Sequence, residues 1–137
     1  MFDASGMVVR EDSLTTIEEA LDEMLEGSKA SSVLLVNSCD GSLVAARGVT
    51  GPLDTTSLAA LAAGAFASTR EIARLVGEPE FTVLFHQGKR QHVHVNIAGE
   101  YGLLMTLFGD ETTVGLVRLC ARKACLRIQS ALAPLSA

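Results

Sequence analysis

The stretch LAALAAGAFASTREIARLV, residues 58–76, decides how this chain folds. Its composition predicts one long helix, because it is rich in alanine and leucine and contains no proline. At about 100° per residue, one side of this helix forms a stripe that we expect to face the core. That stripe consists of Leu58, Leu61, Ala65, Ser68, Ile72 and Leu75. The opposite side carries Ala60, Ala63, Ala67, Arg70 and Arg74, with Gly64 beside it.

The outward side of this helix is unusually bare. A helix surface that faces solvent usually carries Lys, Glu and Gln, so alanines beside a glycine indicate that another backbone packs closely there. That backbone could belong to a second copy of this helix or to a loop of a partner. The alternative is that alanine is simply the best helix former and Gly64 is tolerated. This alternative does not explain why a glycine stands in mid-helix, where it destabilises the helix by about 1 kcal/mol relative to alanine.

Length and composition set the class of protein. The 137 residues suffice for one domain, which we place at 13–137 after a flexible arm at 1–12. Apolar residues make up 48% and aromatic residues only 4%, so the core is aliphatic. The net charge of −5 argues against nucleic acid and anionic membranes as main partners. Membrane insertion is not expected either, because no apolar run approaches about 18 residues.

The N-terminus shows no signal-peptide pattern, so we expect a cytoplasmic protein. Its three cysteines, Cys39, Cys120 and Cys125, are an odd number without CxxC spacing. We therefore expect free thiols.

The remaining elements follow from periodicity and turn signals. A first helix begins at a capping box formed by Thr15 and Glu18 and ends at Gly27. Strands at 32–37 and 43–49 are joined by an Asp-Gly turn, and the long helix runs from a cap at Asp54 or Thr55 to Gly77. Three more strands are expected at 81–86, 91–98 and 101–108. A last helix starts at 112 or 113 and runs to 134.

This order, α-β-β-α-β-β-β-α, predicts an α+β sandwich. Five strands joined mainly by hairpins give an antiparallel sheet, with the long helix on one face and the other two helices on the opposite face. The edges of such a sheet need protection, which a second copy of the chain often supplies.

No pattern in the sequence supports catalysis. Walker, GxGxxG, GxSxG and HExxH motifs are absent, so no catalytic residue and no cofactor are predicted. His92 and His94 share one face of a strand, which is the simplest arrangement for two metal ligands. No third ligand lies near them in sequence, so we expect surface histidines on a half-solvated strand and no metal. Binding or regulation is therefore favoured over an enzyme.

The first and last helices carry opposite charges. The first has an acidic face of Glu18, Glu19, Asp22, Glu23 and Glu26, and the last has a basic face of Arg118, Arg122, Lys123 and Arg127. Such faces are usually solvated. If the two helices are neighbours, they also form surface ion pairs of about 0–1 kcal/mol each.

The ordered set of motifs resembles the roadblock / dynein light chain family, and most of all its bacterial MglB branch. The residues that carry the resemblance are LLVNSCDGSLVAARG (34–48), LAALAAGAFASTREIARLVGEPEF (58–81), HQGKR (86–90) and GLLMTLFGDETTVGLVRLCARKA (102–124). The similarity covers roughly residues 14–133.

The resemblance implies a roadblock sandwich that forms a homodimer, with sheets joined at the third strand and the long helices side by side. The implied dimer interface comprises Ala60, Gly64, Glu71, Phe81, Val83 and Phe85. It also implies a partner, a Ras-like small GTPase of the MglA type in its GTP-bound state. That partner would dock on Ala60, Ala63, Ala67, Arg70 and Arg74.

Members of this branch act as GTPase-activating proteins in cell polarity and gliding motility, and they reposition catalytic residues of the GTPase itself. The other class kept open is a non-catalytic roadblock scaffold that tethers a GTPase or assembles a signalling or motility complex. The sequence stops at Ala137, whereas MglB proteins often carry a further tail that is implicated in nucleotide control. On that ground we do not expect exchange-factor activity.

Overall fold

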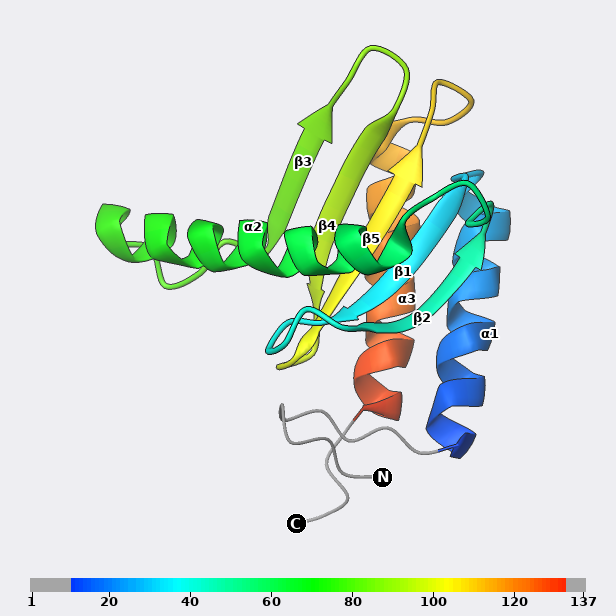
Figure 1. The fold of residues 1–137 in the computed structure, drawn as a ribbon, viewed down its shortest axis with the longest axis horizontal. Coiled ribbons are helices and arrows are strands. Elements are labelled where there is room, and N and C mark those ends of the chain that lie inside the picture. Colours follow the sequence, from blue (N-terminus) through cyan, green and yellow to red (C-terminus); the bar gives the residue numbers. More distant parts are fainter. Residues whose placement is uncertain (1–10, 133–137) are drawn as a thin grey trace.

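The computed structural model describes residues 11–132, and the predicted order of elements is confirmed over them (Figure 1). The helices are α1 (Glu11–Ser28), α2 (Thr55–Val76) and α3 (Val114–Ala131). The strands are β1 (Ser32–Asn37), β2 (Leu43–Gly48), β3 (Val83–Gln87), β4 (His92–Ala98) and β5 (Gly102–Phe108). The flexible arm expected at 1–12 lies mostly outside the described residues, and its last two residues belong to α1.

The five strands form one antiparallel sheet in the order β2-β1-β5-β4-β3. Every residue of β1 and β5 is buried, which is the consequence of their central positions. The strands β2 and β3 form the two edges. Of these, β3 is the more exposed, so it is the edge at which pairing with another chain is easiest.

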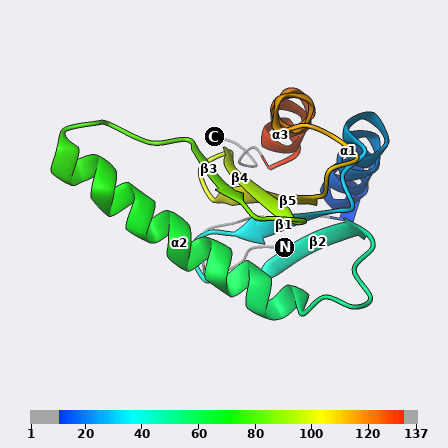
Figure 2. The same ribbon diagram turned by 90° about the horizontal axis from the view of Figure 1, so that it is seen from above.

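Two hydrophobic cores lie on the two faces of the sheet, as the predicted sandwich requires. One core joins α1 and α3 to the sheet through residues such as Ile17, Leu21 and Ile128. The other joins α2 to the opposite face, with Phe66 packed among Leu34 and Met105. Figure 2 shows the resulting layers, with α2 on one side of the sheet and α1 and α3 on the other.

The expected contact between the acidic and basic helices is also confirmed. Arg127 on α3 forms ion pairs with Glu19 and Glu23 on α1, at 3.5 and 2.7 Å. Arg47 on β2 pairs with Glu18 and Asp22, each at 3.2 Å. These pairs occupy much of the acidic face of α1 and fix α1 beside its neighbours.

Most element boundaries agree with the sequence expectation to within one residue, and the two largest differences are at element starts. The first helix ends at Ser28, and Lys29, rather than the expected Gly27, adopts a positive φ, of 60°. The first helix starts at Glu11, so the predicted cap at Thr15 is wrong: the Thr15 hydroxyl lies inside the helix and donates to the Glu11 carbonyl oxygen at 3.3 Å. The third strand starts at Val83, not at Phe81. The predicted end of the last helix at Pro134 lies outside the described residues.

Candidate functional site

The helix α2 is fixed at both ends by its own sequence. The Asp54 carboxylate accepts hydrogen bonds from the Ser57 backbone N–H, at 3.1 Å, and from the Ser57 hydroxyl, at 2.7 Å. These bonds lower the pKa of Asp54, because they favour the ionised carboxylate. At the other end Gly77, at which the sequence predicted that this helix ends, adopts a left-handed conformation with φ of 82°.

The predicted core stripe of α2 is wrong. The buried side of α2 consists of Ala59, Ala62, Phe66, Thr69 and Ala73, of which the first three belong to the core shared with the sheet. From the predicted stripe, Leu61, Ile72 and Leu75 are 69%, 53% and 70% exposed, Ser68 is exposed, and only Leu58 and Ala65 are half-buried. The helix is therefore rotated by about 100°, one residue, from the orientation that its largest aliphatic side chains predicted.

Bulky side chains from the sheet explain this rotation. The strands under α2 supply Leu34, Leu103, Met105 and Leu107 to the shared core. Because these side chains already fill the space, the helix packs on them through alanines and a single large residue, Phe66. As a result, Leu61, Ile72 and Leu75, which the sequence pattern alone predicted to be buried, face outward.

These outward residues form a surface that we call the aliphatic flank: Leu61, Ile72 and Leu75, which lie within about 60° of one another around the helix. The C-terminal half of α2 extends past β3 and off the sheet, as Figures 1 and 2 both show. Phe66 is the last residue of α2 that belongs to either core. An apolar surface on a projecting helix is typical of an interaction site. Sequence reasoning missed it, although the signal was present: two stripes of the helix were apolar, and only one could face the sheet.

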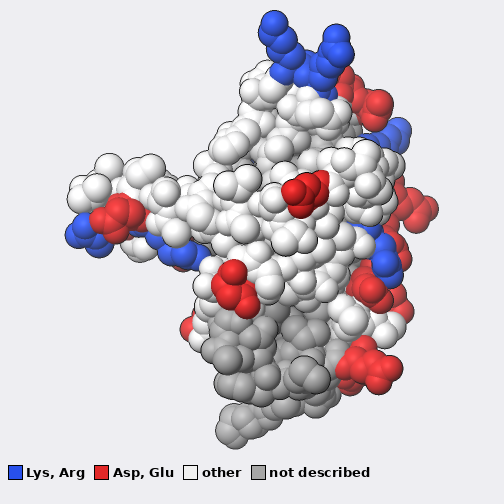
Figure 3. All heavy atoms as spheres, in the orientation of Figure 1, with Lys and Arg blue, Asp and Glu red and all other residues white. Residues whose placement is uncertain are grey.

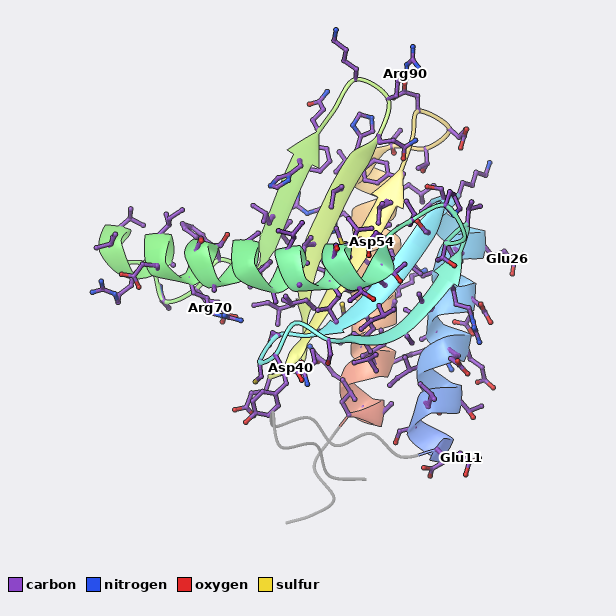
Figure 4. The ribbon with its side chains drawn as sticks, in the orientation of Figure 1. Glu11, Glu26, Asp40, Asp54, Arg70 and Arg90 are labelled. Atoms are coloured by element: carbon purple, nitrogen blue, oxygen red, sulfur yellow. The ribbon has the colours of Figure 1, made fainter. Side chains whose placement is uncertain are left out.

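The second outward surface is the alanine–arginine flank, the predicted docking set of Ala60, Ala63, Ala67, Arg70 and Arg74. All five are exposed except Ala63, which is half-buried. Figure 4 shows Arg70 projecting from the side of α2. Arg74 donates from Nε to Glu71 at 3.1 Å, so its guanidinium is held along the helix. Figure 3 shows that few Lys, Arg, Asp and Glu side chains interrupt the face on which α2 lies, apart from those toward its free end.

Part of the alanine content of this flank has an intramolecular cause. The turn between β1 and β2 packs on α2 at Gly41, where an added Cβ would lie 3.1 Å from the Cα of Ala60 and 3.6 Å from the Cβ of Ala63. A close-packed backbone was predicted on this side of the helix, and here it belongs to the same chain. Ala67 lies beyond this turn and stays exposed.

We expect Gly41→Ala to lower the free energy of unfolding by about 2 kcal/mol. Gly41 has a φ of 72°, which L side chains rarely adopt, and the new methyl group would press on the α2 backbone. Urea unfolding measures the change. Gly51→Ala is the matched control, because nothing lies within 4 Å of an added Cβ there. Equal stability of the two variants would contradict the close packing of turn and helix.

The predicted dimer residues lie on two elements. On α2, Gly64 has nothing within 4 Å of an added Cβ, so its outward side is open. Near the sheet edge, Phe81 and Val83 are half-buried, and Phe85 is 38% exposed while its ring stacks on Phe108 at 6.1 Å. The edge strand thus presents an aromatic ring that is only partly covered by its own chain.

The two histidines of β4 are buried, so the prediction of surface histidines is wrong. His94 lies beside Arg118 of α3, and the His92 ring lies beside the rings of Phe85 and Phe108. The Nδ1 atom of His92 accepts a hydrogen bond from the Gly88 N–H at 3.2 Å, and its Nε2 atom lies 3.1 Å from the Asp110 carboxylate. His94 is 1% exposed, and neither ring nitrogen has a hydrogen-bond partner among the described residues. Over residues 11–132, no group of three or more metal-ligating side chains occurs.

We expect the protein to lose stability as the pH falls below about 6.5, partly because of His94. Burial and the positive charge of Arg118 lower its pKa from the usual 6.5, so the unfolded chain takes up a proton more readily than the folded one. Between the two pKa values the contribution changes by up to about 1.4 kcal/mol per pH unit. Urea unfolding across this range should show a flatter pH dependence for His94→Gln. His86→Gln, at an exposed position on β3, should leave the dependence as it is; equal slopes for all three proteins would contradict the assignment.

The geometry defines the class of protein: a roadblock-type sandwich with one exposed helix on one face of its sheet. The Roadblock/LC7 domain family matches residues 16–108, and the chain belongs to this family. None of the curated proteins matches it.

Among solved structures, this chain is similar to members of the MglB branch of the family. MglB of Myxococcus xanthus is 36% identical, with 85% of this chain and 94% of that chain covered and a TM-score of 0.81. The gliding protein MglB of Thermus thermophilus is 29% identical, with coverages of 92% and 95% and a TM-score of 0.85. A structure described as MglB with a tetrameric arrangement is also 29% identical, with coverages of 92% and 94% and a TM-score of 0.86. An MglB-like roadblock domain is, in general terms, a GTPase-associated regulator.

No helix between residues 11 and 132 is both long and apolar enough to cross a membrane. All three cysteines are free thiols, as predicted.

Proposed function

We propose that the chain is a homodimeric activator of a Ras-like small GTPase of the MglA type. The observation that carries the proposal is that α2 projects beyond the sheet and has two exposed sides, the aliphatic flank and the alanine–arginine flank. A homodimer uses the aliphatic flank and a GTPase uses the alanine–arginine flank, with Ala60 assigned to both contacts. The similarity to MglB, one structure of which is described as tetrameric, supports self-assembly of this kind.

The aliphatic flank is assigned to the second copy. Its three residues are large and aliphatic, and obligate homodimer interfaces are more hydrophobic than transient ones. Its C-terminal members, Ile72 and Leu75, belong to the half of α2 that extends past β3, the exposed edge strand, so one partner can contact helix and edge together. The dimer interface then comprises Leu61, Ile72 and Leu75 in addition to Ala60, Gly64, Glu71, Phe81, Val83 and Phe85.

The alanine–arginine flank is assigned to the GTPase. The small, exposed side chain of Ala67, beside the half-buried Ala63, allows the switch region of the partner to approach the helix backbone. Arg70 and Arg74 add positive charge beside this contact in a chain whose net charge is −5. The chain inserts no catalytic group of its own; it holds the GTPase in the conformation in which its own residues hydrolyse GTP.

The test is GTP hydrolysis by the cognate MglA-type GTPase with and without this protein, together with binding to its GTP-loaded and GDP-loaded states. We expect faster hydrolysis and preferential binding of the GTP-loaded state. Binding without acceleration would establish a scaffold that tethers the GTPase. Absence of binding in both states would overturn the proposal.

A further inference from the structure

A polar groove lies on the face of the sheet opposite α2, between α3 and the strands β3 and β4. Its volume is about 260 Å³. The side of α3 that borders it carries Arg118 and Arg122, and the strands contribute His94 and Asn96. Within the sheet α3 packs mainly on β4 and β5, so the sheet toward β3 is left open on this side.

The floor of this groove contains polar atoms without partners. His94 is 1% exposed and Asn96 is 9% exposed. Both ring nitrogens of His94 and the Oδ1 atom of Asn96 have no hydrogen-bond partner among the described residues. The other end of the Asn96 amide is engaged, because its Nδ2 atom donates to the Cys125 sulfur at 2.8 Å. Unpaired polar atoms are costly to bury, so such a floor indicates a ligand that supplies the missing hydrogen bonds.

The rim of the groove is positively charged. Arg118 and Arg122 are four residues apart on α3 and therefore lie on the same side of the helix. Neither forms an ion pair with another residue in the part of the chain that the structure describes, whereas Arg127 on the same helix is paired with two carboxylates. Two free guanidinium groups over a polar floor match an oxyanion, which they can bind with several charge-assisted hydrogen bonds.

The floor distinguishes between oxyanions. The Asn96 Oδ1 atom is an acceptor, so a fully ionised oxyanion would oppose it with another acceptor. A phosphate group that keeps one proton has both kinds of atom: charged oxygens for the arginines and a hydroxyl that donates to Asn96. The neutral His94 ring, with one donor and one acceptor nitrogen, suits either end of such a group.

We propose that this groove binds the phosphate group of a small molecule, either free phosphate or a phosphate monoester, with Arg118 and Arg122 holding its charged oxygens and Asn96 Oδ1 accepting its proton. The site is separate from both flanks of α2. Its occupancy can therefore be measured independently of dimerisation and of any GTPase.

The test is a titration of the full chain with inorganic phosphate, glycerol 3-phosphate and sulfate at about pH 6, where phosphate groups still carry part of their second proton. Binding is followed by NMR through the Asn96 side-chain amide and the His94 ring. We expect saturable shifts with both phosphates and weaker binding of sulfate, although sulfate carries more charge. Tighter binding of glycerol 3-phosphate than of inorganic phosphate would identify an ester as the ligand, and the reverse would identify free phosphate. Sulfate binding as tight as phosphate would overturn the assignment of phosphate.

Two double variants that each remove two positive charges test the role of the arginines. Arg118→Gln/Arg122→Gln should weaken phosphate binding at least about tenfold, because both charge-assisted contacts are lost. Lys89→Gln/Arg90→Gln removes the same charge from the exposed turn between β3 and β4 and should change the affinity less than about twofold. All four positions are exposed, so both proteins should fold. Linear, unsaturated shifts in the wild type, or equal losses in the two variants, would overturn the proposal.

Discussion

Leu75→Asp should convert the protein from a dimer into a monomer. Leu75 is 70% exposed in the single chain and lies on the aliphatic flank, which we assign to the second copy. Aspartate at this position would place a carboxylate in an apolar contact without a partner. We expect the dissociation constant of the dimer to rise by about a hundredfold or more, which corresponds to about 2.7 kcal/mol.

Sedimentation equilibrium over a range of concentrations measures this change. Leu126→Asp is the matched control, because Leu126 is 64% exposed on α3, on the other face of the sheet, and should leave the dimer intact. Circular dichroism establishes that both variants are folded. A wild-type protein with the mass of one subunit at tens of micromolar, or a Leu75→Asp protein that remains dimeric, would contradict the assigned interface.

Ala67→Arg should weaken binding of the GTP-loaded GTPase about thirtyfold, or by 2 kcal/mol or more. A long charged side chain would then occupy the place where the switch region approaches the helix. Arginine ranks near alanine in helix propensity, so folding should be unaffected. Ala67 is the informative position, since Ala60 and Ala63 also contact the turn at Gly41 and their enlargement would disturb the chain itself.

Calorimetric titration of the GTP-loaded partner measures this affinity. Ser130→Arg adds the same charge to an exposed position on α3 and should leave the affinity unchanged. Sizing and circular dichroism establish that Ala67→Arg is still a folded dimer. If such a protein bound the GTPase as tightly as the wild type, the docking site would lie elsewhere, and α3 would be the next surface to test.

The order of elements and the two-faced sandwich could be predicted from the sequence, because strand 32–37, the Asp-Gly turn and the caps of α2 at Asp54 and Gly77 are local signals. The orientation of α2 could not. It depends on the volume that Leu103, Met105 and Leu107 leave free, and these residues follow α2 in the chain by more than twenty-five positions. A helix with two apolar stripes carries no local signal for which stripe is buried.

Some features of the candidate sites could likewise be predicted from the sequence, and others could not. The exposure of Ala67, Arg70 and Arg74 followed from their shared side of the helix and is confirmed. The burial of His92 and His94 did not follow, because alternation along β4 places them on one face without telling what covers it. Only the packing of α3 on the sheet determines that this face is enclosed.

The end of α2 beyond Phe66 has a thermodynamic consequence. These residues belong to neither core, and only Thr69 and Ala73 among them are buried, so within one chain the segment depends mainly on helix hydrogen bonds and on the Gly77 cap. Helical turns of this kind open at low free-energy cost and exchange their amide hydrogens readily. Dimerisation would stabilise these turns, so their stability would depend on the concentration of the protein. The fraction of molecules in which this end of α2 is ordered then depends on protein concentration. Dilution alone would dissociate the dimer and make the end of the helix less stable.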